Sequence, residues 1–397
     1  MTNPAVSDEP APSTHKKPVA LRRILISAGE ASGENYGAQL ITALRRIRPE
    51  LEFFGVGGER MREAGCDTVV DASELAVVGI TEILSRLPRI YGEFRKLIYE
   101  ADQRRPDAAV VIDSPAFNLK VARQMHRRNI PVVYYVAPQF WAWRQGRVRY
   151  IRQYFRKALV IFPFEEQFYR SHGVDAEFVG HPLANVPRPQ VSRQEFAREY
   201  GLDVSKTWIA LLPGSRVKEV RMNLPTMVEA AQRLGTDYEF LLPVAPTLER
   251  RFLDGMIAGS KTGIRLTSGS LATLANARAA VVASGTATVE AAAMDTPFIM
   301  VYRVTPASWA LGRRLVKVDR FAMVNLLAGE EVVPELVQSR FSAENVVAEL
   351  NKILYDGPAR SKMLAGLGRV RATLGAGNAG DKTAAERAAE ATLAALQ

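Results

Sequence analysis

Short apolar runs alternate with longer amphipathic stretches along most of the chain. The runs consist mainly of Ile, Leu, Val, Ala and aromatic residues, and most are followed by a stretch with helical periodicity. Continuous apolar runs of this length are typical of strands buried on both faces of a parallel sheet. The pattern therefore predicts an α/β protein with doubly wound domains. The predicted strands are 23–27, 51–55, 107–112, 131–136, 158–162, 176–179, 208–212, 238–244, 264–266, 279–283 and 297–302.

A short polar segment containing two prolines, residues 186–190, interrupts this alternation, which restarts immediately afterwards. Such a segment is typical of a domain boundary. We expect a disordered leader over 1–20, an N-terminal domain over 21–186, a C-terminal domain over 187–372 and a C-terminal helix within 373–397. The leader is rich in Pro, Ser and charged residues and lacks the apolar core of a signal peptide.

The composition narrows the class of protein. The 397 residues are 47% hydrophobic and 24% charged, which is ordinary for a folded protein with a sizeable core. Cys66 is the one cysteine, which excludes an intramolecular disulfide and a cysteine-built zinc site and suits a reducing cytoplasm. No apolar run approaches the about 20 residues of a membrane span. The net charge of +10 favours acidic partners: nucleic acid, anionic lipid or a phosphorylated substrate.

Two turns in the second half carry groups that suit an anion. The turn 211–216, Leu-Leu-Pro-Gly-Ser-Arg, joins a strand to a helix, where backbone N–H groups, the Ser215 hydroxyl and the Arg216 guanidinium could bind a diphosphate. An ordinary connection with a surface arginine is the alternative. The turn 284–290 offers the hydroxyls of Thr286 and Thr288, and its Glu290 suits ribose hydroxyls or merely caps the helix. Two such turns in one domain favour a nucleotide site.

Polar residues also follow the strands of the first half. The Gly-rich loop 28–34 brings backbone close to a ligand, but it lacks the G-x-G-x-x-G pattern of a dinucleotide site. Its Glu30 and Glu34 suit sugar hydroxyls better than a phosphate. Asp113 comes directly after a buried strand and is the leading general-base candidate, with helix capping as the alternative.

Three further features allow both a functional and a structural interpretation. Trp141 and its neighbouring Trp143 and Arg144 could contact a sugar or phosphate, or the tryptophans could simply be buried. His181, between a strand and a proline, either orients substrate or caps. In the segment 75–96, apolar residues interleave with arginines and a lysine, which is typical of a surface that lies on anionic lipid or of a core-facing helix with a solvated basic face.

Ten short motifs occur together in one order between roughly residues 23 and 370. They are SAGEASGE (27–34), GVGG (55–58), ELAVVGITEIL (74–84), IDSPAFN (112–118), FWAWR (140–144), PFE (163–165), FVGHPL (178–183), LLPGSR (211–216), ASGTATVE (283–290) and NLLAGEEVVPELVQ (325–338). Together they closely resemble the lipid-A-disaccharide synthase family, glycosyltransferase family 19. Any one motif is weak evidence, and the set is specific.

The resemblance implies a GT-B fold: two Rossmann-like domains facing across a cleft, with the C-terminal half binding UDP and the C-terminal helix packing back on the N-terminal domain. It implies an inverting transfer of 2,3-diacylglucosamine from UDP to 2,3-diacylglucosamine 1-phosphate, giving the β-(1→6) disaccharide phosphate and UDP. A base deprotonates the acceptor 6-hydroxyl in such a displacement. No cofactor and no metal are expected.

The resemblance also implies residue roles. Asp113 matches the family's essential aspartate, and Arg216 the arginine proposed to neutralise the leaving UDP. Expected donor contacts are Gly214, Ser215, Ser284, Gly285, Thr286, Asn325, Glu335 and Gln338, with Glu290 inferred from the wider GT-B pattern. Expected acceptor or sugar contacts are Glu30, Ser32, Gly33, Trp141, Arg144 and His181. Expected membrane-facing residues are Val77, Ile80, Leu84, Arg86 and Arg89.

Two departures from the family pattern affect these assignments. Ala116 replaces the second acidic residue of the usual DAPDFN, so that carboxylate is not required here. Ala137 and Gln139 stand in the loop where the family usually has SPSVWAWR, so two hydroxyls are missing from it.

The expected partners are the two acylated sugars, the anionic inner membrane, contacted peripherally from the cytoplasmic side, and a second copy in a homodimer. Nucleic acid is not an expected partner. One alternative is another GT-B enzyme that uses UDP-GlcNAc, either an epimerase or a transferase making a peptidoglycan precursor. The other is a basic nucleic-acid-binding protein, although the positive charge is scattered and no RRM, KH or helix-turn-helix pattern is visible.

Overall fold

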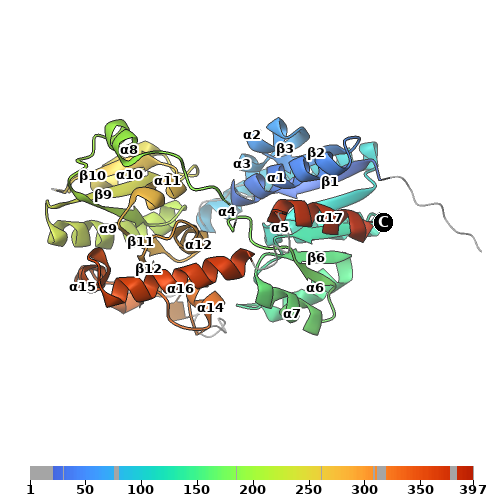
Figure 1. The fold of residues 1–397 in the computed structure, drawn as a ribbon. Helices are drawn as coiled ribbons and strands as arrows, with labels where there is room; N and C mark the ends of the chain where they lie inside the picture. The colour runs from blue at the N-terminus through green and yellow to red at the C-terminus, as the bar shows by residue number, and fades with distance from the viewer. Residues whose placement is uncertain are drawn as a thin grey trace, which may run out of the picture.

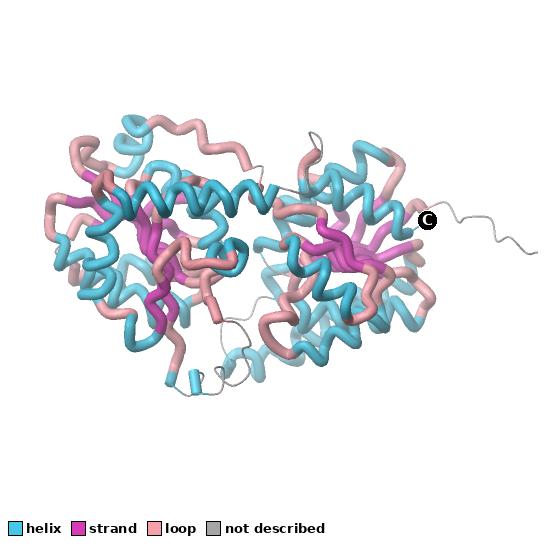
Figure 2. Tube along the Cα trace, turned by 60° about the horizontal axis from the view of Figure 1, so that its bottom comes forward, coloured by secondary structure: helices cyan, strands magenta, loops and turns pink. Residues whose placement is uncertain are grey.

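The computed structural model describes residues 21–29, 31–75, 80–184, 186–260, 262–306, 309–310, 319–375 and 382–396, with the backbone alone at 31 and 80–86. The chain forms two lobes, and in each lobe helices cover both faces of a sheet (Figure 1; Figure 2). Both sheets are parallel throughout. This confirms the prediction of an α/β protein with two doubly wound domains.

The N-terminal sheet has the strand order β3-β2-β1-β4-β5-β6-β7. Its strands are β1 (Arg23–Ala28), β2 (Glu52–Gly57), β3 (Cys66–Asp71), β4 (Ala108–Ile112), β5 (Val132–Tyr135), β6 (Lys157–Val160) and β7 (Ala176–Phe178). The helices of this part of the chain are α1 (Ala31–Ile47), α2 (Glu59–Glu63), α3 (Ala72–Leu75), α4 (Ile80–Arg104), α5 (Pro115–Arg127), the 3₁₀ helix η1 (Gln145–Arg147), α6 (Val148–Tyr154) and α7 (Pro163–Ser171).

The C-terminal sheet has the order β10-β9-β8-β11-β12-β13. Its strands are β8 (Thr207–Leu212), β9 (Tyr238–Val244), β10 (Ile264–Ser268), β11 (Ala279–Ala283), β12 (Phe298–Tyr302) and β13 (Glu335–Val337). The helices are α8 (Arg193–Tyr200), α9 (Val217–Leu234), α10 (Arg250–Ile257), α11 (Ser270–Asn276), α12 (Thr286–Ala293), α14 (Met323–Ala328), the 3₁₀ helix η2 (Gln338–Arg340), α15 (Ala343–Leu354), α16 (Pro358–Gly375) and α17 (Ala384–Leu396). The predicted boundary at 186–190 lies between β7 and α8.

The central strands are buried on both faces, as their apolar runs predict. Every residue of β4, Ala108–Ile112, is fully buried. In the sheet, Ala108 of β4 lies beside Ile24 of β1, and Ala109 of β4 lies beside Val132 of β5. Both sheets reverse their strand order once, between β1 and β4 and between β8 and β11. A crevice forms outside the carboxyl ends of the strands at such a reversal, and ligands of α/β proteins bind there.

Two strands were not predicted. In β3, the sequence Cys-Asp-Thr-Val-Val-Asp mixes polar with apolar residues because this edge strand is buried only in part. The edge strand β13 has three residues, which is too short for a periodic pattern.

The C-terminal helix returns to the N-terminal lobe, as the family resemblance implies. The long helix α16 leaves the C-terminal lobe towards the other one, and α17 packs against α1, β5 and β6 (Figure 1). Glu386 of α17 pairs with Arg46 of α1 at 3.2 Å, and the Arg387 Nε donates to the carbonyl oxygen of Val179 at 2.9 Å. The last helix therefore covers the sheet of the first domain.

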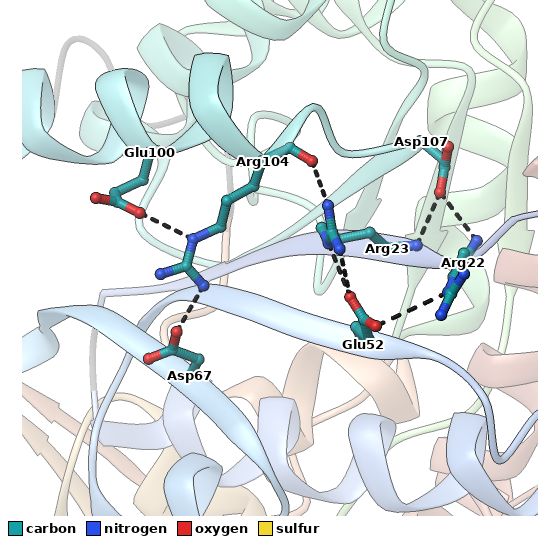
Figure 3. Close-up of polar contacts among 7 residues, drawn as sticks. All are labelled: Arg22, Arg23, Glu52, Asp67, Glu100, Arg104 and Asp107. Carbon is teal, nitrogen blue, oxygen red and sulfur yellow. Dashed lines mark hydrogen bonds and ion pairs between the residues drawn. The ribbon is translucent and has the colours of Figure 1, made fainter.

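A polar network holds the edge of the N-terminal sheet where the strands begin (Figure 3). Arg104, the last residue of α4, bonds Asp67 at 2.5 Å and Glu100 at 2.8 Å, and its carbonyl accepts from the Arg23 Nη1 at 2.6 Å. The Arg23 Nη2 in turn lies 2.7 Å from Glu52. The network holds α4, β1, β2 and β3 together at the sheet edge opposite the carboxyl ends of the strands.

Gly55 in β2 gives a test of this backbone. Its φ is +148°, and a Cβ there would overlap the carbonyl oxygen of Ile26 in the neighbouring strand. Because that oxygen is backbone and cannot rotate away, we expect Gly55→Ala to destabilise the N-terminal domain by about 3 kcal/mol or more. Gly92→Ala is the control: no atom within 4 Å meets the added Cβ on α4, so it should stabilise by up to about 1 kcal/mol. Calorimetric unfolding of both variants measures the difference, and equal midpoints would contradict the strand register.

Candidate active site

Asp113 directly follows β4 at the strand-order reversal of the N-terminal sheet. Both Asp113 and Ser114 have left-handed φ angles, 49° and 46°. The buried Asn118 of α5 holds this turn: its Nδ2 donates to the carbonyls of Ile112 at 2.9 Å and Asp113 at 2.7 Å, while its Oδ1 accepts from the Ser27 Oγ at 2.7 Å. The cap position of α5 is Ser114, so Asp113 precedes the cap. This geometry favours the base hypothesis over the capping alternative for Asp113.

The Gly-rich loop after β1 lies against the Asp113 turn. A Cβ on Gly33 would lie 3.7 Å from the Asp113 Cβ, and one on Gly29 would lie 2.8 Å from the Ser114 Oγ. Ser32, half-buried, lies in the first turn of α1, while Glu30 is outside the described residues. The adjacent ends of β1 and β4 thus form one surface.

Glu34, which the sequence suggested for sugar hydroxyls, has another role. Its Oε1 accepts from the backbone N–H of Arg60 at 3.0 Å, at the start of α2. An acidic side chain is stabilising at a helix N-terminus. Glu34 therefore bonds the backbone at the start of α2, and its contact with sugar hydroxyls stays a prediction.

Tyr36 of α1 was missed by the sequence analysis. It is buried, and burial raises the pKa of its phenol, with further contributions from the carboxylates of Glu290 and then Asp113. Glu290 belongs to α12 of the other domain, so carboxylates of both domains act on this phenol. A tyrosine on a helix is most often a core residue, and the sequence carried no signal that two acidic candidates raise the pKa of this one.

The turn 213–216 begins α9 and already holds an anionic group. Gly214 has a φ of +122°, and the backbone N–H groups of Ser215 and Arg216 donate to the Glu219 Oε2 at 3.1 and 3.3 Å. The Arg216 Nη1 donates to the Glu219 Oε1 at 3.0 Å, and the Asn223 Nδ2 donates to the Pro213 carbonyl at 2.9 Å. The predicted anion-binding groups therefore converge on one carboxylate, which belongs to the protein itself.

The turn after β11 begins α12 without a side-chain cap. Gly285, with a φ of +138°, occupies the cap position, and Thr286 is exposed at the helix start. The Ser284 Oγ donates to the Phe321 carbonyl at 2.9 Å. Thr288, in contrast, is fully buried and donates to the Gly285 carbonyl at 2.8 Å, so the expectation that its hydroxyl faces a phosphate was wrong.

Glu290 lies further along α12. Burial raises the pKa of its carboxyl, and a hydrogen bond with Ser270 acts in the opposite direction. A half-buried carboxyl can accept hydrogen bonds from ligand hydroxyls, as an acidic residue does in other nucleotide sites.

Asn325 and Glu335 build the loops beside β11 and β12. The Asn325 Nδ2 donates to the Val333 carbonyl at 2.8 Å and to the Glu335 Oε1 at 2.9 Å, and its Oδ1 accepts from the Val332 and Val333 N–H groups at 2.8 and 3.0 Å. Glu335 also accepts from the backbone of Phe321 at 2.9 Å. These bonds hold the wall of a cavity of about 320 Å³ lined by Asp319, Arg320, Asn325, Glu331, Glu335 and Arg340.

Gln338, the first residue of η2, directly follows β13 and supports the same region. Its φ is +52°, and in the amide orientation that satisfies both groups its side chain accepts from the Val304 N–H at 3.1 Å and donates to the Val304 carbonyl at 3.2 Å. Here the Asn325 and Gln338 amides bind the protein backbone, which indicates that they position loops around the cavity.

Trp141 is buried, so it provides no stacking face for a sugar in this structure. Its Nε1 donates to the Glu165 Oε1 at 2.9 Å, and its ring packs edge-on against Phe164 at 4.9 Å between centroids. Trp143 is 44% exposed and carries the Arg144 guanidinium 4.4 Å from its ring centroid. The exposed Trp143–Arg144 pair is therefore better placed than Trp141 to meet a ligand.

His181 is 2% exposed and its ring packs against Phe162 at 5.2 Å. Burial lowers its pKa to about 3, and its Nδ1 accepts from the Leu183 N–H at 3.1 Å. The ring is therefore neutral and holds the turn that follows β7. This geometry favours the capping interpretation over substrate contact.

The predicted membrane-facing residues are described only in part. Val77 lies outside the described residues, and the side chains of Ile80, Leu84 and Arg86 are not described. Arg89 pairs with Glu74. Further along α4, Leu87, Tyr91 and Tyr99 are exposed apolar side chains, at 44%, 62% and 61%. Within the described part of the chain, no helix is long and apolar enough to cross a membrane.

The two parallel Rossmann-like sheets and their strand-end turns define the class: this is a GT-B protein. Solved structures with this fold cover nearly the whole chain. They include a glycosyltransferase of kitacinnamycin (TM-score 0.64, 14% identity, 94% of this chain and 99% of that chain). Another is a UDP-GlcNAc 2-epimerase from Neisseria meningitidis (TM-score 0.62, 11% identity, 94% and 100%). At such low identities the likeness shows the fold alone.

Sequence comparison identifies the family. The family model described as lipid-A-disaccharide synthetase matches residues 24–386. The lipid-A-disaccharide synthase of Koribacter versatilis is 55% identical, over 94% of this chain and 99% of the relative, and that of Acidobacterium capsulatum is 49% identical, over 88% and 91%. The chain belongs to the lipid-A-disaccharide synthase family, which confirms the resemblance drawn from the ten motifs. It is a glycosyltransferase with a role in lipid A biosynthesis.

The buried Glu165 makes the stability of the fold depend on pH. Burial raises the pKa of its carboxyl from 4.5 to about 7. Because the pKa is raised, the folded protein binds this proton more tightly than the unfolded chain does. The resulting contribution to the free energy of unfolding is complete below pH 4.5 and is lost as the pH rises through about 7. Between about pH 5 and about pH 8 we expect the protein to lose on the order of 3 kcal/mol of unfolding free energy relative to Glu165→Gln. Urea unfolding at several pH values measures this.

Glu166→Gln is the control for that measurement. Glu166 lies on the same helix and is partly exposed in an ion pair with Arg170 at 2.7 Å. Its replacement should leave the slope of stability against pH unchanged. A slope that is the same in Glu165→Gln as in the unmodified protein would show that Glu165 does not titrate in this range.

Proposed function

We propose that this enzyme transfers 2,3-diacylglucosamine from its UDP derivative to the 6-hydroxyl of 2,3-diacylglucosamine 1-phosphate. The products are the β-(1→6) disaccharide 1-phosphate and UDP. One observation carries the proposal beyond family membership. Tyr36 is close enough to Asp113 of one domain and Glu290 of the other for both carboxylates to raise its pKa. A base candidate of one domain and a nucleotide-binding candidate of the other thus both raise the pKa of one buried phenol.

Asp113 is the proposed base. Its carboxylate takes the proton of the acceptor 6-hydroxyl while the oxygen attacks the anomeric carbon from the face opposite the UDP oxygen. The glycosidic C–O bond forms as the bond to UDP breaks, which inverts the anomeric configuration. The hydrogen bonds of Asn118 hold the backbone of the Asp113 turn, so the carboxylate is positioned before the acceptor arrives.

The turns before α9 and α12 are the proposed seat of the UDP diphosphate. The Arg216 guanidinium and the backbone N–H groups of the first turn, together with the start of α12 at Thr286, are suited to the negative charge that grows on the leaving UDP. The cavity lined by Arg320, Asn325 and Glu335 is the proposed place of the nucleoside. It is linked to the turn after β11 because Ser284 bonds Phe321, whose N–H donates to Glu335.

Contact with the membrane follows from the chemistry of the substrates. Both sugars carry acyl chains. Leu87 and Tyr91, within the segment 75–96, and Tyr99, just beyond it, are exposed apolar side chains of α4. Apolar side chains and nearby arginines together bind anionic bilayers. We therefore place the enzyme at the cytoplasmic face of the inner membrane.

An assay of the purified protein tests the reaction. With UDP-2,3-diacylglucosamine and 2,3-diacylglucosamine 1-phosphate, we expect release of UDP and formation of the disaccharide phosphate. Turnover of UDP-GlcNAc in the absence of acylated substrates, with no UDP released from the acylated donor, would favour an epimerase or another UDP-GlcNAc enzyme.

Asp113→Asn tests the base. Asparagine has nearly the same size but accepts no proton, so kcat should fall by a factor between about 10² and 10⁴ while the Kd for UDP stays unchanged. Asp175→Asn is the control, because Asp175 is an exposed carboxylate just before β7, at the opposite edge of the sheet. A near-normal kcat in Asp113→Asn would assign the base to another residue.

Arg216→Ala tests the leaving-group role. Loss of charge-assisted hydrogen bonds to the diphosphate should weaken UDP binding by roughly ten- to a hundredfold and lower kcat as well. Arg233→Ala, at the far end of the same helix, removes an exposed arginine paired with Glu229 and should change neither value. Calorimetric titration with UDP decides the question, and an intact affinity in Arg216→Ala would refute the assignment.

A further inference from the structure

Glu219 occupies the turn that the proposed function assigns to the UDP diphosphate. Its Oε2 accepts from the backbone N–H groups of Ser215 at 3.1 Å and Arg216 at 3.3 Å, and its Oε1 accepts from the Arg216 Nη1 at 3.0 Å. Phosphate oxygens at this helix start would require the same three donors. The carboxylate and the diphosphate therefore compete for one set of hydrogen bonds.

The backbone of the turn is shaped around the carboxylate. A Cβ on Gly214 would lie 2.5 Å from the Glu219 Oε2 and 2.6 Å from the Glu219 Cβ, so only a glycine allows this close approach. The φ of +122° at Gly214 also favours glycine. The bound carboxylate therefore keeps the turn in the conformation that binds an anion.

The side chain also has room to leave. The Glu219 side chain is 37% exposed and that of Arg216 is 55% exposed, so the carboxylate borders solvent on one side. Two anions on the same donors would repel each other, and the diphosphate carries the larger charge. Binding of the diphosphate should therefore turn the Glu219 side chain out towards water.

We propose that Glu219 is an internal anion that fills the diphosphate seat of the empty enzyme and is displaced when the UDP-sugar binds. After transfer, the carboxylate returns to the same N–H groups and to Arg216, which lowers the affinity for UDP and speeds its release. The inference rests on the proposed function, because it takes the turn 213–216 as the diphosphate seat. Glu219 is a positioning residue in this scheme and does not touch the reacting atoms.

Calorimetric titration with two probes tests the proposal. UDP carries the diphosphate, and uridine lacks it. In Glu219→Gln and in Glu219→Ala we expect the Kd for UDP to fall by about tenfold, because no anion has to be displaced, while the Kd for uridine stays unchanged. In the steady-state assay, the inhibition constant of product UDP should fall by the same factor.

Glu229→Gln is the matched control. Glu229 lies on the same helix, is exposed and pairs with Arg233 at 2.8 Å, so its replacement removes one negative charge from α9 away from the turn. Its Kd for UDP should not change. A merely structural cap at Glu219 predicts a lower melting temperature and equal or weaker UDP binding, which would overturn the proposal. Tighter binding in Glu219→Gln but not in Glu219→Ala would also overturn it, because the new amide would then be the cause.

The failure of the proposed function looks different. If the unmodified protein does not bind UDP, the turn is not the diphosphate seat. The same conclusion follows if Arg216→Ala and the unmodified protein bind UDP equally tightly. If UDP binding depends on Arg216 but the two Glu219 variants do not bind UDP more tightly, the displacement proposal alone is refuted.

Discussion

The reversal of strand order in each parallel sheet is the constraint on which the rest of the structure depends. At β1 and β4, and again at β8 and β11, neighbouring strands send the chain to opposite sides of the sheet, which leaves a crevice at their carboxyl ends. Asp113 and the Gly-rich loop belong to the first crevice, and the two turns that begin α9 and α12 belong to the second. The topology therefore sets the position of the candidate site, and the side chains at the strand ends set its chemistry.

The return of the chain to its first domain links the two crevices. The N–H of His181, just after β7, donates to the carbonyl of Leu374 near the end of α16 at 3.2 Å, and α17 then lies on α1. Arg188 of the connecting segment donates to the Met294 carbonyl at 3.0 Å. The first of these bonds joins the two domains, and the second holds the connecting segment on the C-terminal domain. The carboxylate of Glu290 in the second domain also raises the pKa of Tyr36 in the first.

The sequence predicts those features that depend on continuous patterns. The central strands are apolar along their length because helices cover both faces, and the strand-end position of Asp113 follows directly from that pattern. Edge strands such as β3 are half-exposed, and their mixed composition hides them. The pattern also does not tell which way a side chain faces. Trp141, Thr288 and His181 lie beside strand ends, yet each is buried: Trp141 bonds Glu165 of α7, and the other two bond the backbone of their own turns. Only packing decides between these roles.

The sequence pattern also does not distinguish one helix start from another, which is why the position of Glu219 in the turn 213–216 was not predicted. Acidic side chains fill several helix starts of this protein, among them Glu34 at α2, Glu165 at α7 and Glu219 at α9. In the sequence these look alike, because a carboxylate at the first turn of a helix is favourable wherever it occurs. They differ in what surrounds them: Glu165 is fully buried, whereas Glu219 borders solvent and accepts hydrogen bonds from the backbone and the guanidinium of Arg216. The start of α12 has Gly285 at its cap position and no side-chain cap. Of the two turns that follow β8 and β11, the first therefore keeps an anion of its own, whereas the second leaves the start of α12 without a side-chain cap.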